Sequence, residues 1–145
     1  MQHFIKALGL TTVLLASSAY AETVAFPKTA ALTYSGNGGV TATMGFNRST
    51  SNYNINTTFK IPLYSMQFRS SGGMNGNTMV PSSYSDTRRG KLYAQAKFNH
   101  GSKTITYGKA GENKTEPMRG VPMDLFSLAW QLALNNGKVS GVSQF

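Results

Sequence analysis

The sequence contains no cysteine, and this absence excludes several kinds of structure at once. Disulfide bonds, a lipid-modified N-terminal cysteine and zinc sites built on thiolates are all ruled out. Histidine is also scarce, with two residues in a chain of 145, so a closed zinc site of histidines is excluded as well. We therefore predict no metal site and no cofactor.

Apolar runs long enough to cross a membrane are missing too. The longest candidate, from Ala7 to Ala16, has about ten residues, whereas a spanning helix needs about 20. Lys6 precedes this run and Ala19-Tyr20-Ala21 follows it, which is the layout of a secretory signal peptide cleaved after Ala21. An amphipathic N-terminal helix is the alternative, but the run has no polar face. We predict a signal peptide at 1–21 and a single soluble domain at 22–145, located in a periplasm because cysteine is absent.

Acidic residues are few, with 5 Asp and Glu against 14 Lys and Arg and a formal net charge of +9. Such a charge favours anionic partners, among them lipid headgroups, lipopolysaccharide phosphates, anionic glycans and nucleic acid. Solubility alone explains the same charge equally well, and both interpretations stay open. Nucleic acid is not expected as a partner, because an exported protein rarely meets it and no oligonucleotide-binding signature is present.

Catalytic constellations are lacking as well. The only histidine after the signal segment, His100, sits in a polar turn, and there is no G-x-S-x-G nucleophile elbow. Of the carboxylates that could form a catalytic pair, Asp124 is better explained as a helix cap. Glu112 and Glu116 lie in a lysine-containing loop, where a solvated charge is the simpler interpretation. We therefore predict that the protein is not an enzyme and has no catalytic residues.

What the sequence does contain is regular alternation of apolar and polar residues. Apolar side chains recur at every second position from Val40 to Phe46 and, with Thr57 as the one polar exception, from Tyr53 to Ile61, which indicates an antiparallel hairpin with one buried face. The same alternation recurs in three further segments, 64–69, 92–98 and 103–109. The polar segment Ser82 to Arg89 has no apolar face, so we place it at a sheet edge. Residues 110–122 are expected to form a polar loop.

One segment, MDLFSLAWQLALNNG, changes to a helical period. Its polar residues Asp124, Ser127, Gln131 and Asn135 form one narrow stripe, Asp124 is placed to cap the N-terminus, and Gly137 ends the helix. A helix this apolar should be mostly buried against the strands. The predicted fold is therefore mainly β: a curved antiparallel meander, or open half-barrel, packed around one C-terminal α-helix.

Two sets of residues are candidate binding sites. The apolar interior is either an ordinary core or, if the barrel is incompletely closed, a groove for an acyl chain, and it comprises Met44, Phe46, Ile55, Phe59, Met66, Phe68 and Trp130. The basic residues that could hold an anionic head, or simply be solvated, are Arg69, Arg88, Arg89, Lys91 and Lys97.

The order of these elements resembles the bacterial exported proteins grouped as domain of unknown function 3108. The resemblance depends on Leu32-Thr33-Tyr34, on Pro81-Ser82-Ser83-Tyr84 before an arginine-containing strand, on the Leu92–Lys109 hairpin, and on Asp124-Leu125-Phe126-Ser127-Leu128 at the start of the helix. It implies an open, unclosed β-barrel, broadly similar to half-barrel carriers that shuttle lipoproteins through the periplasm, and it implies no enzymatic activity. Family members continue with further strands that are missing here, so the sequence resembles a short or truncated member.

These observations lead to two functional hypotheses. The first is a non-enzymatic periplasmic envelope protein that binds an amphiphile or lipid with an anionic headgroup, lipopolysaccharide included. The second is an interaction or scaffold module of the cell envelope, which would bind another envelope protein by adding a strand to an exposed sheet edge. An outer-membrane barrel is disfavoured, because Gly141 and Ser143 are not the apolar residues that a last lipid-facing strand needs.

Overall fold

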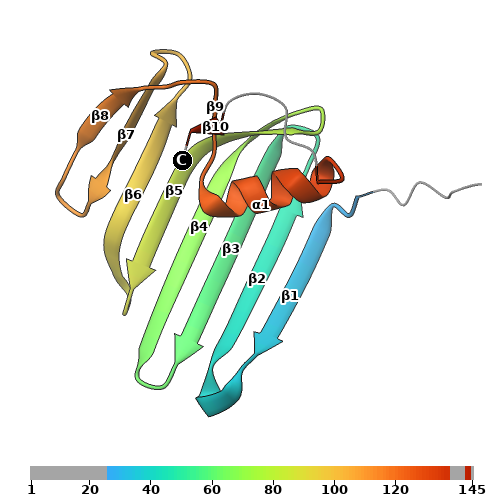
Figure 1. The fold of residues 1–145 in the computed structure, drawn as a ribbon, viewed down its shortest axis with the longest axis vertical. Coiled ribbons are helices and arrows are strands. Elements are labelled where there is room, and N and C mark those ends of the chain that lie inside the picture. The colour runs from blue at the N-terminus through green and yellow to red at the C-terminus, as the bar shows by residue number, and fades with distance from the viewer. Residues whose placement is uncertain (1–25, 138–142, 145) are drawn as a thin grey trace, which may run out of the picture.

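The computed structural model describes residues 26–137 and 143–144. Its main feature is an eight-stranded antiparallel sheet whose strands follow one another in chain order, from β1 to β8 (Figure 1). The strands are β1 (Thr29–Ser35), β2 (Thr41–Arg48), β3 (Asn52–Ile61), β4 (Tyr64–Asn75), β5 (Thr78–Arg88), β6 (Lys91–Asn99), β7 (Thr104–Lys109) and β8 (Lys114–Pro117). The sheet is not closed, because β1 and β8 do not pair with each other.

The helix α1 (Leu125–Leu134) lies across one face of this sheet (Figure 1). A short 3-10 turn, η1 (Asn37–Gly39), connects β1 to β2, and β9 (Val121–Pro122) pairs in parallel with β10 (Ser143–Gln144). The predicted fold class, a mainly β open meander with one C-terminal helix, is thus confirmed. The predicted signal peptide and its cleavage after Ala21 lie outside the described residues. No helix within the described part of the chain is long and apolar enough to cross a membrane.

Two details differ from the sequence-based expectation. The polar segment 82–89 does not lie at an edge, since β5 pairs with both β4 and β6 in the middle of the sheet. Its inner face is polar because Asp86 is buried there and pairs with Arg88 at 2.9 Å. Residues 110–122 do not form a plain loop, because they contain the short strands β8 and β9.

The strand register decides which side chains lie under α1. In β3, Ile55 lies opposite Phe46 of β2 and Ser70 of β4, and directly opposite residues share a face of the sheet. We call the face that α1 covers the inner face. The buried hydrophobic residues that meet there form one cluster: Phe46, Tyr53, Ile55, Met79, Phe126, Trp130 and Leu134.

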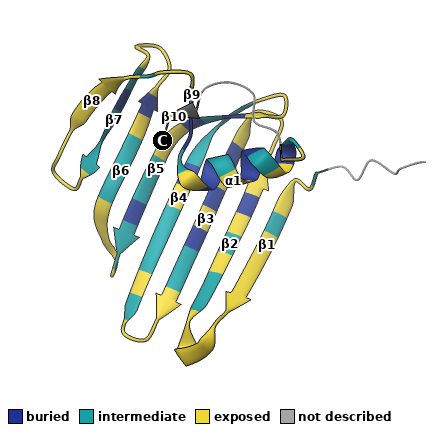
Figure 2. Cartoon of the chain, in the orientation of Figure 1, coloured by how far each residue is buried: buried dark blue, intermediate teal, exposed yellow. Residues whose placement is uncertain are grey.

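Aromatic stacking fills the centre of this core. The Trp130 ring lies nearly parallel to the Phe46 ring, with centroids 4.2 Å apart and an angle of 14° between the planes. Phe26, just before β1, meets both rings edge-on. The indole Nε1 of Trp130 donates a hydrogen bond to the sulfur of Met44 at 3.2 Å. Buried positions gather under the helix, whereas much of the far half of β1–β3 is exposed (Figure 2).

The polar stripe of α1 faces the sheet, which the apolar composition of the helix did not predict. Gln131 is buried, and its Oε1 accepts a hydrogen bond from the backbone N–H of Met79 at 2.6 Å while its Nε2 donates to the carbonyl of Asn77 at 2.9 Å. Ser127 is buried beside it, whereas Leu125 is 72% exposed on the other side of the helix. The helix is therefore held by hydrogen bonds as well as by apolar packing.

Asp124 connects the start of the helix to the sheet. Its Oδ1 accepts hydrogen bonds from the backbone N–H groups of Phe126 and Ser127, both at 3.0 Å, which confirms the predicted N-cap. Its Oδ2 accepts a hydrogen bond from the hydroxyl of Ser70 at 2.6 Å, and Ser70 in turn contacts the hydroxyl of Tyr53 at 3.3 Å. This chain of contacts fixes the helix start above β3 and β4.

Two bulges bend the strands next to the helix start. Between β4 and β5 the register shifts at Ser71 and Gly72, where a Cβ on Gly72 would lie 2.1 Å from the carbonyl oxygen of Val80. Only glycine allows the two backbones to approach so closely. Between β5 and β6 a second shift leaves Tyr93 as the extra residue. Bulges increase the local twist of the strands that they join.

Candidate binding cleft

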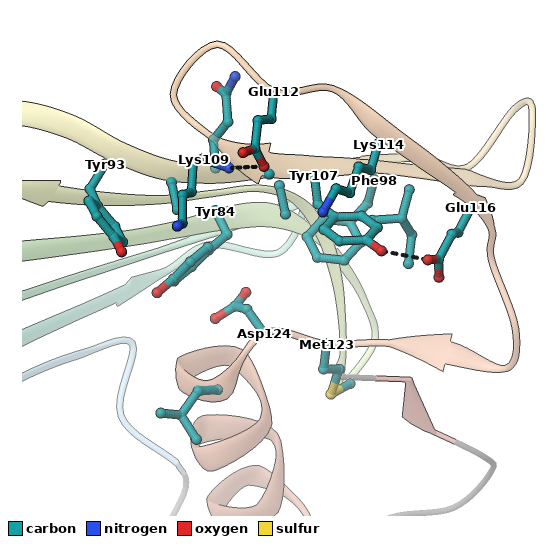
Figure 3. Close-up of a pocket in the computed structure, with 16 residues that line it drawn as sticks. Tyr84, Tyr93, Phe98, Tyr107, Lys109, Glu112, Lys114, Glu116, Met123 and Asp124 are labelled. Atoms are coloured by element: carbon teal, nitrogen blue, oxygen red, sulfur yellow. Dashed lines mark hydrogen bonds between the residues drawn. The ribbon is translucent and has the colours of Figure 1, made fainter.

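An open cleft lies beside the helix rather than under it. It has a volume of about 860 Å³ and is enclosed by the inner face of β5–β8 on one side and by residues Met123 to Leu125 on the other (Figure 3). We call it the β5–β8 cleft. Its volume falls within the range of about 300–1,000 Å³ typical of small-molecule sites in proteins.

The hollow exists because small side chains of β6 lie between large ones of its neighbours. Ala96 sits directly between Tyr84 of β5 and Tyr107 of β7, and Ala94 lies opposite Lys109 of β7. An alanine leaves the space that a larger side chain would fill, while the flanking aromatic rings form the walls. The cleft floor is therefore mostly apolar.

Further apolar contacts come from both sides of the cleft. Phe98 and Ile105 are buried opposite each other on β6 and β7, and both line the floor. Met123 is buried on the helix side, and Leu125 is largely exposed to the opening. These residues continue the core side chains outward, so the cleft is an unfilled extension of the apolar inner face.

Charged side chains line the rim. Lys109, Lys114, Glu112 and Glu116 come from the ends of β7 and β8 and the turn between them (Figure 3). Glu116 accepts a hydrogen bond from the hydroxyl of Tyr107 at 2.5 Å, and Glu112 accepts one from the backbone N–H of Lys109 at 3.4 Å. Within the described residues, the ammonium groups of Lys109 and Lys114 have no hydrogen-bond or ion-pair partner, so they are free to meet an anion.

Two tyrosines of the cleft stay protonated at ordinary pH. Burial, reinforced by the negative charges of Asp86 and Asp124, raises the pKa of Tyr84 to about 12. The hydrogen bond to Glu116 raises the pKa of Tyr107 in the same direction. Both phenols therefore present neutral rings to a ligand.

The turn between β7 and β8 is held close to the sheet by Gly108. Its φ of 151° and the position of Glu112 leave no room for a side chain, since an added Cβ would lie 2.8 Å from the Cβ of Glu112. This close approach keeps the glutamate and the two rim lysines on one wall of the cleft.

The seven apolar residues predicted to line a guest groove lie mainly in the filled core. Phe46, Ile55 and Trp130 are buried, Met44, Phe59 and Phe68 pack against that core, and Met66 is half-buried. None of them lines the β5–β8 cleft. Six of the seven, all except Met66, meet in the core between α1 and the sheet, and Trp130 is the one that the helix contributes. The β5–β8 cleft lies farther along the sheet.

Three of the five basic residues predicted to hold an anion lie together at the β5–β6 turn, and the other two lie elsewhere. Arg88 pairs with Asp86 and lies over the ring of Tyr93 at 3.5 Å. Arg89 lies 5.0 Å from the centre of the Tyr64 ring. Lys91 lies opposite Arg88 at the same β5–β6 turn, whereas Arg69 and Lys97 are exposed on the outer face of the sheet.

Sequence reasoning missed the two lysines that line the cleft. Lys109 follows Ile105 and Tyr107 at the same spacing of two, so the alternation predicts that it shares their face of the strand. The alternation does not predict a cleft beside Lys109. Lys114 fell within the expected loop, so no face could be assigned to it. The alternation in 92–98 predicts the face on which the alanines of β6 lie, but it does not indicate a hollow above them.

The remaining candidates for chemistry have structural roles. The Nε2 of His100 donates to the carbonyl oxygen of Pro81 at 2.6 Å, which ties the β6–β7 turn to β5. No group of three or more histidine, aspartate or glutamate side chains in the described part of the chain is placed to hold a metal ion.

Comparisons with known proteins give no relative. No protein-family model matches the chain, no curated protein matches its sequence, and no solved structure matches its fold.

Proposed function

We propose that this protein is a non-enzymatic envelope protein of the periplasm that binds an amphiphile with an anionic headgroup in the β5–β8 cleft. The observation that carries the proposal is an apolar hollow of about 860 Å³ whose rim holds two lysines that have no partner among the described residues. The signal-peptide pattern and the resemblance to exported proteins of domain of unknown function 3108 support the location.

The floor of the cleft suits an acyl chain. Methylene groups placed against Ala94, Ala96, Phe98 and Ile105 would leave water for an apolar surface, a gain of about 0.8 kcal/mol for each buried group. On the helix side of the cleft, the carboxylate of the cap residue Asp124 is already engaged by Ser70 and by backbone N–H groups.

The rim suits the head of such a molecule. Lys109 and Lys114 would bind a phosphate or carboxylate near the surface, where charge pairs are partly screened by water. Glu112 and Glu116 also line the rim but already accept hydrogen bonds from the protein. The apolar floor accepts the acyl chain and not a charged group, which directs the head outward to the two lysines.

A fluorescence titration with a dansyl-labelled fatty acid tests this proposal. Ala96→Phe should fill the hollow between Tyr84 and Tyr107 and abolish saturable binding, whereas the control Ala129→Phe, on the exposed side of α1, should not. Organic extraction of the purified protein followed by mass spectrometry would then identify a bound lipid. Absence of saturable binding together with absence of any extracted lipid would refute the proposal.

The lysines are tested in the same titration. Replacing Lys109 and Lys114 with glutamine should weaken binding about 2- to 30-fold, the range expected for two screened charge contacts. The control pair, Lys60→Gln with Lys97→Gln, removes the same charge from exposed positions on the outer face. Equal loss in both pairs would mean that net charge, and not the rim of the cleft, attracts the ligand.

A second function, an interaction module that uses a sheet edge, is favoured by one specific observation. The sheet is open, and its first strand, β1, is uncharged along its whole length and is exposed at six of its seven positions. Such an edge offers backbone groups to another strand.

A further inference from the structure

We propose that β1 pairs with β1 of a second copy of this chain, about a two-fold axis at Leu32, so that two sheets join into one. This inference does not depend on amphiphile binding. It gives the sheet-edge hypothesis a definite partner, and the argument starts from the backbone of the strand.

One row of backbone groups on β1 points away from the sheet. The carbonyl of Lys28, just before β1, accepts a hydrogen bond from the N–H of Arg48 at 2.7 Å. The N–H of Gly36, just after β1, donates to the carbonyl of Val40 at 2.8 Å. Lys28 and Gly36 therefore both bond towards the β2 side of the strand. In an antiparallel pair such residues alternate with residues that bond outward. The outward set is Thr29, Ala31, Thr33 and Ser35. Nothing in the described part of the chain pairs with this outer edge.

The two edges of the sheet are built differently. β8 is short, carries Lys114 and Glu116, and ends in Pro117, which has no N–H to donate. Charge, proline and shortness are the devices that protect an edge from pairing. β1 has none of them: its seven residues, TAALTYS, pair with β2 in an unbroken register and include no charged residue. The unprotected edge is therefore β1 alone.

The sequence of β1 fits a second copy of itself. With Leu32 opposite its own copy, Ala31 lies opposite Thr33, and both belong to the outward set that would form the hydrogen bonds. Ala30 then lies opposite Tyr34, a small side chain against a large one. Residues that share a face in one copy share it in the pair, so both inner faces lie on the same side of the joined sheet.

The exposed apolar area of β1 and its lack of charge both favour a second copy of the chain as the partner. Leu32 is 38% exposed and Tyr34 is 58% exposed on the inner-face side, and pairing would place Leu32 of the second copy beside Leu32 and Ala30 of the second copy beside Tyr34. Although the chain carries a formal net charge of +9, no lysine would meet a lysine along the strand. Lys28, just before β1, would lie opposite Gly36 of the second copy.

Cysteine crosslinking tests this arrangement cleanly, because the chain has no cysteine of its own. In the proposed pair the two Leu32 positions face each other with Cα atoms about 4.5 Å apart, within the range that a disulfide bridges. The two Tyr34 positions would be offset along the strands by about 13 Å. Under mild oxidation, Leu32→Cys should form a covalent dimer about tenfold faster or more than the matched control Tyr34→Cys.

Sedimentation of the purified full chain provides the second measurement. The unaltered protein should sediment as a dimer, and Thr33→Pro should sediment as a monomer, because proline removes an outward N–H without breaking a bond to β2. The control Thr33→Val keeps that N–H and should remain a dimer. A monomeric unaltered protein, equal crosslinking at Leu32 and Tyr34, or a dimeric Thr33→Pro variant would overturn the inference.

Discussion

At the scale of single residues, Thr57 is the least satisfied side chain of the core. It is almost completely buried between Met44 and Phe68, and its hydroxyl has no hydrogen-bond partner among the described residues. A buried hydroxyl without a partner costs stability, and valine has nearly the same shape without that group. Thr57→Val should therefore raise the free energy of unfolding by about 1–2 kcal/mol in a urea titration.

A neighbouring threonine provides the control for this prediction. Thr58 follows Thr57 in β3 but lies on the outer face, half-buried. Thr58→Val should change the free energy of unfolding by less than about 0.5 kcal/mol. If Thr57→Val lowered stability instead, the hydroxyl would have a partner that the structure does not contain.

Alternation in the sequence predicted single residues well where a strand has one apolar face. Phe46 and Ile55 were placed on the buried side correctly, because a period of two assigns faces without knowledge of the neighbouring strands. The cleft could not be predicted in this way. It depends on the register that sets Ala96 between Tyr84 and Tyr107, which no single strand contains.

At the scale of elements, α1 depends on Gln131 for its position. This side chain bonds the N–H of Met79, a buried residue of β5, and the carbonyl of Asn77. Gln131→Met keeps the length of the side chain but leaves the buried N–H unpaired, so we expect a loss of about 1–3 kcal/mol in the free energy of unfolding. Gln67→Met, on the outer face of β4, should cost much less. Equal losses in urea titrations would contradict this role.

The helical period of the sequence predicted α1 and its N-cap, but it did not predict which side of the helix faces the sheet. The narrow polar stripe was visible in the sequence, yet it is buried because the end of β5 offers Gln131 an N–H and a carbonyl to bind. For the same kind of reason, β5 was misplaced at an edge. Its inner face carries Asp86, which is buried and forms an ion pair with the partly exposed Arg88, and the sequence of one strand cannot show that such a pair forms.

At the scale of the whole molecule, the apolar inner face is divided into two parts. Under α1 it is filled by the cluster around Trp130 and Phe46, and beside α1 it remains open as the β5–β8 cleft. Met123 and Leu125, which lead into the helix, form one wall of that cleft. Both parts therefore require the helix to be seated on the sheet, and this seating is the central claim.

Acrylamide quenching of Trp130 fluorescence tests the seating most directly, because Trp130 is the only tryptophan in the chain. The indole is buried against Phe46 and Phe26, so in the folded protein its Stern–Volmer quenching constant should be severalfold lower than in urea-unfolded protein. Quenching as strong in the folded protein as in the unfolded protein would show that α1 is not seated on the sheet, and would contradict both the core and the cleft described above.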